Sequence, residues 1–250
     1  MSQGLVLLLL GGAVLRISAF STSYLNYVKP GFRPFLIAAG AVVFILGAII
    51  LVQEWRKPAK EGPDEEHGEE HAHHDDGHGH DHAHGPRVAW LMTLPVFAIF
   101  LIAPPALGSY AAARDDVAPP PPAREVVEGY APLPDGQAVA MPIGEFVGRA
   151  WGDPKRSLTG KRVRLTGFVV KGKKKDTWYV ARMQLNCCAA DALALKVAVK
   201  GAPAPAENTW VEVTGTWIPP KSDKLPNGTV PPEIESVSVV EVPQPTEPYE

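Results

Sequence analysis

Two adjacent cysteines and a nearby aspartate are the residues of this sequence best suited to chemistry. Cys187 and Cys188 are the only cysteines in 250 residues, and Asp191 follows them in the stretch LNCCAADALALKV. Thiolates bind soft metal ions such as zinc, and a carboxylate can add a further ligand. Three ligands are one fewer than a closed tetrahedral zinc site needs. The spacing therefore predicts a zinc site of Cys187, Cys188 and Asp191 whose fourth position is filled by water, a substrate or a partner.

Three other uses of the cysteine pair remain open from the sequence. A disulfide within the pair is disfavoured, because adjacent Cα atoms lie about 3.8 Å apart and most bridges need roughly 4.4–6.8 Å. Packing in a core is the usual fate of a free cysteine. A bridge to another molecule, or thiol-redox chemistry, would suit an oxidising compartment. Metal binding, core packing, a bridge to another molecule and redox chemistry are thus alternative interpretations of the same two cysteines.

A histidine-rich tract provides a second group of metal-binding side chains. All eight histidines lie between His67 and His84, and the stretch 61–85 holds nine carboxylates and no Lys or Arg. The tract has no bulky apolar residue, so we expect a disordered linker that binds metal weakly, at several sites and in a pH-dependent way. A purely hydrophilic linker is the alternative. The ligands predicted in the tract are His71, His73, His74, His78, His80, His82 and His84.

The sequence lacks the motifs of the common enzyme classes. It contains no GxGxxG, GxxxxGK[ST], HExxH, CxxC or GxSxG. Because every histidine lies in the tract, a nucleophilic Cys or Ser has no histidine partner as general base elsewhere in the sequence. The net charge of −3 and the lack of a dense basic and aromatic patch argue against a nucleic-acid partner. We therefore expect a protein that is not an enzyme and does not bind nucleic acid.

Composition changes sharply along the chain, which excludes a uniform soluble globule. The chain is 46% hydrophobic, yet its 26 prolines cluster outside the apolar stretches. These changes predict five segments: two transmembrane helices (1–56), a disordered linker (57–87), a third transmembrane helix (88–110), a proline-rich spacer (111–140) and a folded domain (141–250).

Three apolar stretches set the expected membrane topology. Pro34–Val52 carries no charge, Gly4–Phe20 contains Arg16, and Val88–Leu107 is interrupted by prolines. A helix needs about 20 apolar residues to cross a bilayer, so we expect two or three spans in a multi-pass protein of the cell membrane. The first stretch lacks a basic region before it, which favours a retained helix over a signal peptide.

Basic residues near the helix ends predict the orientation. Lys29 and Arg33 lie between the first two apolar stretches, whereas four basic residues flank the linker: Arg56, Lys57, Lys60 and Arg87. Basic residues favour the cytoplasmic side of a membrane. The linker is therefore expected in the cytoplasm and the C-terminal domain outside it.

The last hundred residues alternate as the strands of a small barrel do. Gly167 and Gly215 stand where bends are expected. The fold class predicted is membrane-anchored α + β, with an OB-like barrel and one short helix, and a sandwich as the alternative. The predicted elements are a helix over Ile143–Ala150 and strands over Arg162–Val170, Thr177–Met183, Ala194–Val199, Trp210–Trp217 and Ile234–Val242.

Two stretches of the sequence resemble the YcgQ-type family of bacterial membrane proteins. One is YVKPGFRP, residues 27–34, between the first two apolar stretches, and the other runs from GKRVRLTGFVV through WYVARMQLNCCAADA to VPQPTEPYE. The Cys-Cys-Ala-Ala-Asp-Ala motif is the most specific part of the resemblance. The resemblance implies an accessory subunit of a two-component permease, working beside a separate multi-pass subunit.

The residues and the resemblance together give one functional prediction. We expect a non-enzymatic accessory subunit whose helices dock a multi-pass permease and whose extracytoplasmic barrel binds a transition metal, zinc in the first place. The alternative is an extracytoplasmic thiol-redox protein that uses Cys187 and Cys188.

Overall fold

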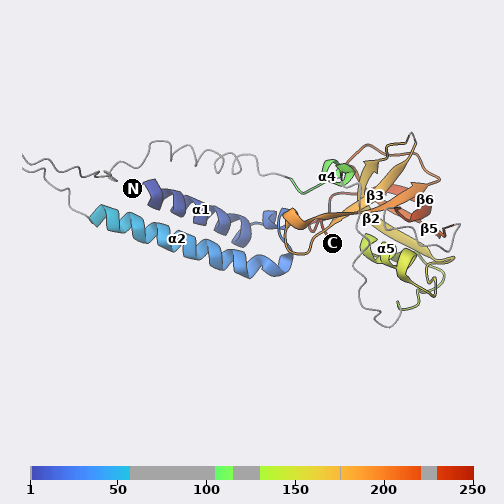
Figure 1. Ribbon diagram of the computed structural model, residues 1–250, viewed down its shortest axis with the longest axis horizontal. Helices are drawn as coiled ribbons and strands as arrows, with labels where there is room; N and C mark the ends of the chain where they lie inside the picture. The colour runs from blue at the N-terminus through green and yellow to red at the C-terminus, as the bar shows by residue number, and fades with distance from the viewer. Residues whose placement is uncertain (1, 57–104, 115–129, 175, 221–229) are drawn as a thin grey trace, which may run out of the picture. The chain divides into compact units, whose positions relative to one another are not determined.

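The computed structural model describes residues 2–56, 105–114, 130–174, 176–220 and 230–250. The chain divides into two compact units (Figure 1). The first contains residues 1–21 and 34–104, and the second contains residues 22–33 and 105–250. The histidine-rich tract and most of the third apolar stretch lie outside the described residues.

Two apolar helices make up the described part of the first unit. Helix α1 spans Ser2–Ala19 and helix α2 spans Arg33–Arg56. The stretch Pro30–Arg56, with a mean hydropathy of 3.0 in its most apolar window, is the one helical stretch among the described residues that is long and apolar enough to cross a membrane. Large side chains on it, such as Phe35 and Ile45, are exposed. One N-terminal helix can therefore anchor the chain in a membrane, and α1 is a shorter apolar companion.

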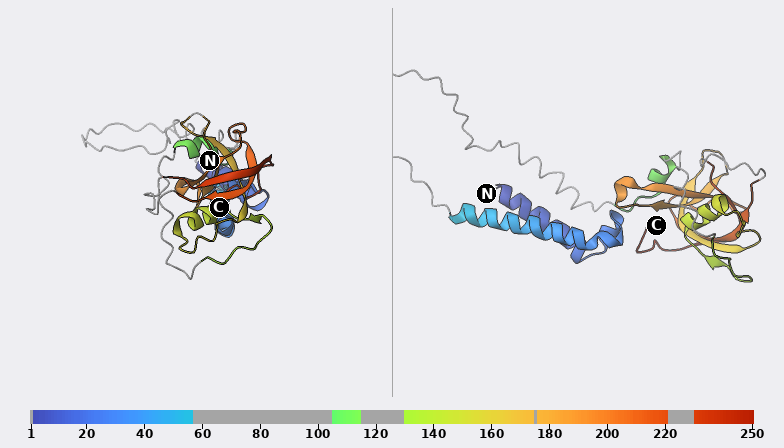
Figure 2. Two further views of the ribbon diagram at one scale, coloured as in Figure 1. Left: turned by 90° about the vertical axis from the view of Figure 1, so that its right-hand side faces the viewer. Right: turned by 60° about the horizontal axis from the view of Figure 1, so that its bottom comes forward.

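Glycines let the two helices pack with their backbones in contact. Gly11 and Gly47 are buried, and a side chain at either position would overlap the backbone of the opposite helix, at Phe44 and Leu8 respectively. These pairs place the start of α1 beside the end of α2, so the helices form an antiparallel hairpin (Figure 2). Small residues serve this purpose at helix contacts in membranes, where close packing replaces the hydrophobic effect.

Five strands in the second unit close into a barrel (Figure 1). Around the barrel the order is β2, β3, β4, β6 and β5, and β5 pairs back onto β2. All neighbours are antiparallel except β4 and β6, and a short strand β1, Val139–Ala140, adds to β2. The barrel strands are β2 (Arg162–Lys171), β3 (Trp178–Gln184), β4 (Leu193–Lys200), β5 (Trp210–Ile218) and β6 (Glu233–Glu241).

This closure confirms the predicted small barrel and its strands, and it excludes the sandwich. The predicted short helix is also confirmed as α5, Ile143–Gly152. Ile143 and Phe146 of α5 are fully buried in the main core, together with the inward-facing Val211 and Val213 of β5. The period of two on each strand and of 3.6 on the helix thus direct the apolar side chains to one interior.

Gly215 marks the predicted bend in β5. The pairing of β5 with β6 shifts register between Thr214 and Gly215, as at a β-bulge. A Cβ atom at this position would overlap the carbonyl oxygen of Glu235 on the neighbouring strand. The bulge bends the strand so that the barrel can close, and this close approach excludes a larger residue there.

A short helix covers part of the outside of the barrel. Helix α4, Ser109–Arg114, buries Ala112 completely against an outer cluster of Phe168, Val170, Ala181, Met183 and Ala194. In two views α4 and α5 lie on different sides of the barrel (Figure 2). The side chains of β2 are consequently buried on both faces from Gly167 to Val170.

Residues 105–114 and 130–140 also belong to the barrel unit. They lie in the stretches predicted as the third span and the proline-rich spacer. Leu107 packs against the outer cluster, and Leu133 lies in the main core. Asp135 forms an ion pair with Lys161, next to β2. Residues 105–114 and 130–140 therefore contribute to the packed fold, while residues 88–104 and 115–129 lie outside the described part.

We expect Ala112→Glu to lower the stability of the barrel. Ala112 has no exposed surface, so a carboxylate there must either be buried without a partner or displace α4. The expected loss is about 2–4 kcal/mol of unfolding free energy. Ala113→Glu, at an exposed position of the same helix, is the matched control and should be neutral. Thermal unfolding of the detergent-solubilised chain measures both, and equal effects would show that α4 does not cover the barrel as described.

Candidate metal centre

The cysteine pair lies in a loop that connects β3 to β4. β3 ends at Gln184, and a turn of 3-10 helix spans Ala189–Asp191 before β4. Cys187 is exposed, Cys188 is half-buried, and both are free thiols. Core packing therefore does not explain this pair, and both sulfurs can be reached from solvent.

Asp191 fixes the shape of this loop. Its Oδ1 accepts a hydrogen bond from the backbone N–H of Asn186 at 2.9 Å, and its Oδ2 accepts one from the N–H of Cys187 at 2.8 Å. The N–H of Asp191 in turn donates to the carbonyl oxygen of Cys188 at 3.0 Å. A carboxylate that accepts two backbone N–H groups orders a short loop. The loop is thus ordered around the two sulfurs.

The three predicted ligands meet as the sequence predicts. One ligand atom from each of Cys187, Cys188 and Asp191 lies within 4.8 Å of the other two. The two Sγ atoms are 3.6 Å apart. Two thiolates on a tetrahedral zinc ion with Zn–S bonds near 2.3 Å would lie about 3.8 Å apart. The sulfur spacing therefore fits a shared zinc ion.

Protonation of the cluster is set by the contact between Cys187 and Asp191. The hydrogen bond from the Cys187 thiol to Asp191, together with the contact with Cys188, raises the pKa of Cys187 to about 12. The same hydrogen bond, with those from the backbone, lowers the pKa of Asp191 to about 2. Without a cation the cluster thus holds one carboxylate and a protonated thiol, so Cys187 is a poor nucleophile. A bound cation favours the thiolate and releases that proton.

The loop that joins α1 to α2 pairs with the cysteine loop. Val28 and Cys188 form an antiparallel β-bridge. Lys29 N–H donates to the carbonyl oxygen of Cys187 at 3.2 Å, and Ala189 N–H donates to that of Tyr27 at 2.7 Å. These bonds flank both cysteines, so a segment about 160 residues away in sequence fixes the backbone of the site.

Tyr249 ties a third segment to this pairing. Its hydroxyl donates to the carbonyl oxygen of Asn26 at 2.7 Å and accepts from the N–H of Leu107 at 2.8 Å. A parallel bridge joins Tyr249 to Met183 at the end of β3. One phenol therefore links residues 22–33, the segment before α4 and the strand that leads to the cysteines.

Glu250, the residue after Tyr249, binds the C-terminal segment to the barrel. Its backbone N–H donates to Met183 and its carbonyl oxygen accepts from Leu185, both at 3.0 Å. Its carboxylate accepts the N–H groups of Ile143 and Gly144 at 2.8 and 2.7 Å, which caps the start of α5. Burial raises the pKa of Glu250, and these two hydrogen bonds oppose that rise. The tail is thus anchored on both sides of Tyr249.

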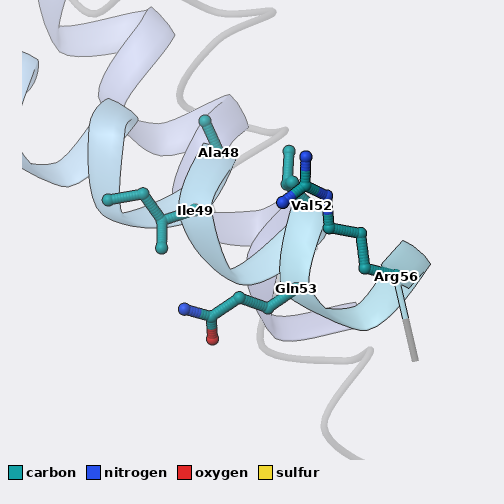
Figure 3. Close-up of a pocket in the computed structure, with 5 residues that line it drawn as sticks. All are labelled: Ala48, Ile49, Val52, Gln53 and Arg56. Carbon is teal, nitrogen blue, oxygen red and sulfur yellow. The ribbon is translucent and has the colours of Figure 1, made fainter.

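The seven histidines predicted as ligands lie outside the described residues. An open groove lies on α2, lined by Ala48, Ile49, Val52, Gln53 and Arg56 (Figure 3). These lining residues include no thiol, imidazole or carboxylate, so this groove lacks the ligands of a metal site.

Sequence reasoning missed the residues that hold the site in place. Tyr27, Lys29 and Tyr249 act through backbone and hydroxyl contacts across long sequence distances, and no spacing or periodicity signals such contacts. The YVKPGFRP and TEPYE stretches stood out only through the family resemblance. The structure brings both stretches to the cysteine loop.

Comparison with known proteins identifies two domains of one family. Residues 3–117 match the DUF1980 N-terminal domain, and residues 153–250 match the DUF1980 C-terminal domain. No curated protein matches the chain. Among solved structures, a putative aspartyl-tRNA synthetase from Leishmania major Friedlin aligns with 11% identity and a TM-score of 0.26. That alignment covers 45% of this chain and 23% of the synthetase chain, and the likeness is too low to carry an argument.

We expect Asp191→Asn to make Cys187 more reactive. The change removes the charge and the acceptor that raise the pKa of Cys187, so more thiolate forms at pH 8. In a Cys188→Ser chain without metal, iodoacetamide should alkylate Cys187 more than tenfold faster. Asp176→Asn is the matched control, because Asp176 is exposed and its φ of 61° suits asparagine. An unchanged rate in Asp191→Asn would contradict the role given to this carboxylate.

Proposed function

We propose that this chain is a membrane-anchored accessory subunit whose barrel unit binds a soft divalent cation, zinc in the first place, and presents it to a permease. The observation that carries the proposal is the cluster of Cys187, Cys188 and Asp191, whose ligand atoms lie within 4.8 Å of one another. Two thiols and a carboxylate form a donor set that selects zinc over calcium or magnesium.

An incomplete shell suits transfer of an ion better than permanent storage. The three ligands leave one tetrahedral position for water or for a donor from a partner. Cys187 is exposed, so a partner can approach this side of the cluster. A metal held by three residues on an accessible loop can pass to a fourth ligand without unfolding the barrel.

Chain connectivity supports a barrel and a linker on opposite sides of the membrane. Residues 22–33 pack with the barrel and lead directly into α2, whereas the linker follows the far end of α2 after Arg56. If α2 spans the bilayer, residues 57–104 must return across it to reach the barrel unit at Pro105. The predicted third span would provide that return. The basic residues around the linker favour a cytoplasmic linker and thus support a barrel outside the cytoplasm.

The permease itself enters the proposal through the resemblance to YcgQ-type proteins.

We infer that the barrel supports the cysteine loop and does not bind nucleic acid. Its strand order, with a parallel contact between the third and fifth barrel strands, supports the OB-like assignment. Such barrels use one face of the sheet for oligonucleotides, with exposed aromatic residues. Here α4 covers Phe168 and Val170 on the outer face of β2. We therefore favour a barrel that carries the metal loop.

Thiol-redox chemistry is the second candidate, and the short Sγ–Sγ distance of 3.6 Å is the observation that favours it. The raised pKa of Cys187 opposes it, because thiol exchange begins with a thiolate. Metal binding therefore ranks first.

The metal test compares thiol variants in a chain whose eight histidines are replaced by Asn. This background removes any binding by the tract, so we expect one Zn²⁺ per chain. Cys187→Ser with Cys188→Ser should abolish that binding and leave the thermal stability largely unchanged, since neither side chain is buried. Ala190→Ser, an exposed change in the same loop, should bind normally. Zinc retained by the double variant, or none in the parent, would refute the metal site.

The topology test labels single cysteines in intact cells with an impermeant maleimide at alkaline pH. Cys188 in a Cys187→Ser chain should react, because the barrel is proposed to lie outside. A cysteine at position 75, introduced as Asp75→Cys in a chain lacking both native cysteines, should react only after the cells are permeabilised. Labelling at position 75 without labelling at Cys188 would reverse the proposed orientation.

A further inference from the structure

We infer that the loop Thr22–Arg33 senses occupancy of the cysteine site, and that Tyr249 is the positioning residue that couples the two. The inference rests on the proposed metal site and adds its regulation. Filling the site should strengthen the pairing of Val28 with Cys188, and loosening that pairing should release the metal. The coupling is assigned to specific backbone and hydroxyl contacts, so it can be tested separately from metal binding.

The first step is the position of the two backbone hydrogen bonds. One ends on the carbonyl of Cys187 and the other starts at the N–H of Ala189, so they bracket the pair of sulfurs. Inside the loop Asp191 holds the N–H of Asn186 and of Cys187. The backbone of both cysteines is thus held by Asp191 within the cysteine loop and by Tyr27 and Lys29 of the loop between α1 and α2.

The second step is that Tyr249 holds the same pairing independently. Its hydroxyl bonds to Asn26, two residues before Val28, while its backbone region bridges to Met183 on β3. Tyr249 is itself anchored through Glu250, which bonds to Met183, Leu185 and the start of α5. A rigid tail therefore keeps residues 22–33 in place opposite the cysteine loop.

The third step is thermodynamic reciprocity. A metal ion binds best when the two sulfurs and the carboxylate hold the right geometry, which the pairing with residues 27–29 maintains. If the pairing increases metal affinity by a given factor, metal binding stabilises the pairing by the same factor. Each hydrogen bond lost should therefore weaken binding several-fold.

Lys29 offers a matched pair of variants for the backbone contact. Its φ of −59° and ψ of 149° suit proline, so Lys29→Pro removes the donor N–H without a clash in the loop. Lys29→Ala removes the same side chain but keeps the N–H. Cd²⁺ titration of the full chain in detergent, in the background without histidines, reads the thiolate-to-metal charge-transfer band. We expect roughly fivefold weaker binding for Lys29→Pro and less than twofold for Lys29→Ala.

Tyr249→Phe tests the hydroxyl contact. It keeps the ring and removes both hydrogen bonds, and we expect roughly tenfold weaker Cd²⁺ binding. Tyr110→Phe, at an exposed tyrosine, is the control and should bind as the parent does. A purely structural role would lower stability alone, so hydrogen exchange of the Lys29 amide supplies a second readout. Cd²⁺ should slow that exchange at least fivefold in the parent, and much less in Tyr249→Phe.

The outcomes separate the inference from the proposed function. No charge-transfer band in the parent chain overturns the metal site and the sensing loop together. A normal band, with equal affinities for Lys29→Pro and Lys29→Ala and with exchange of Lys29 unaffected by Cd²⁺, overturns the sensing loop and leaves the metal site standing. Weaker binding in Lys29→Pro and Tyr249→Phe, together with metal-dependent protection of Lys29, supports both.

Discussion

The pairing of residues 27–29 with residues 187–189 is the contact on which the other features of the site depend. It orients the backbone of both cysteines, and it joins a loop between two apolar helices to a barrel that follows much later in the chain. Two backbone hydrogen bonds thus connect residues near the start of the sequence to the loop that carries both cysteines.

Because the barrel fixes the position of the cysteine loop, two backbone hydrogen bonds are enough to orient it. Its closed sheet, the bulge at Gly215 and the helix α5 give a packed interior, so the loop after β3 starts from a fixed position. Asp191 then shapes the loop from within, and the tail around Tyr249 holds the opposing segment. Side chains outside the Cys-Cys-Asp cluster therefore define its geometry, as the residues around the ligands do in known metal sites. The positive charge of a bound ion would in turn offset the two thiolates and the carboxylate.

Much of this fold could be predicted from local patterns, whereas the surroundings of the site could not. Local patterns predicted the five barrel strands and α5 almost to the residue, and β5 shows why, because its buried side chains alternate along the whole strand. The Cys-Cys-Asp cluster was predictable because its members are neighbours in sequence. The packing of Leu133 and of the residues around α4 could not be predicted from the proline-rich composition. A few buried side chains hardly change the composition of a polar segment. The contacts of Lys29 and Tyr249 join distant backbone groups, which leave no trace in residue type.

The distance along the chain between the two halves of the pairing has a consequence for biosynthesis. Residues 27–29 leave the ribosome about 160 residues before the cysteines and more than 200 before Tyr249, so the helices can be inserted long before their loop has a partner. Until then the backbone groups of Tyr27 and Lys29 must be satisfied by water or lipid headgroups. The backbone around Cys187 and Cys188 can therefore take up its full set of hydrogen bonds only after synthesis has reached Tyr249. On the proposed topology and metal site, that step would follow export, and the first ion would come from outside the cytoplasm.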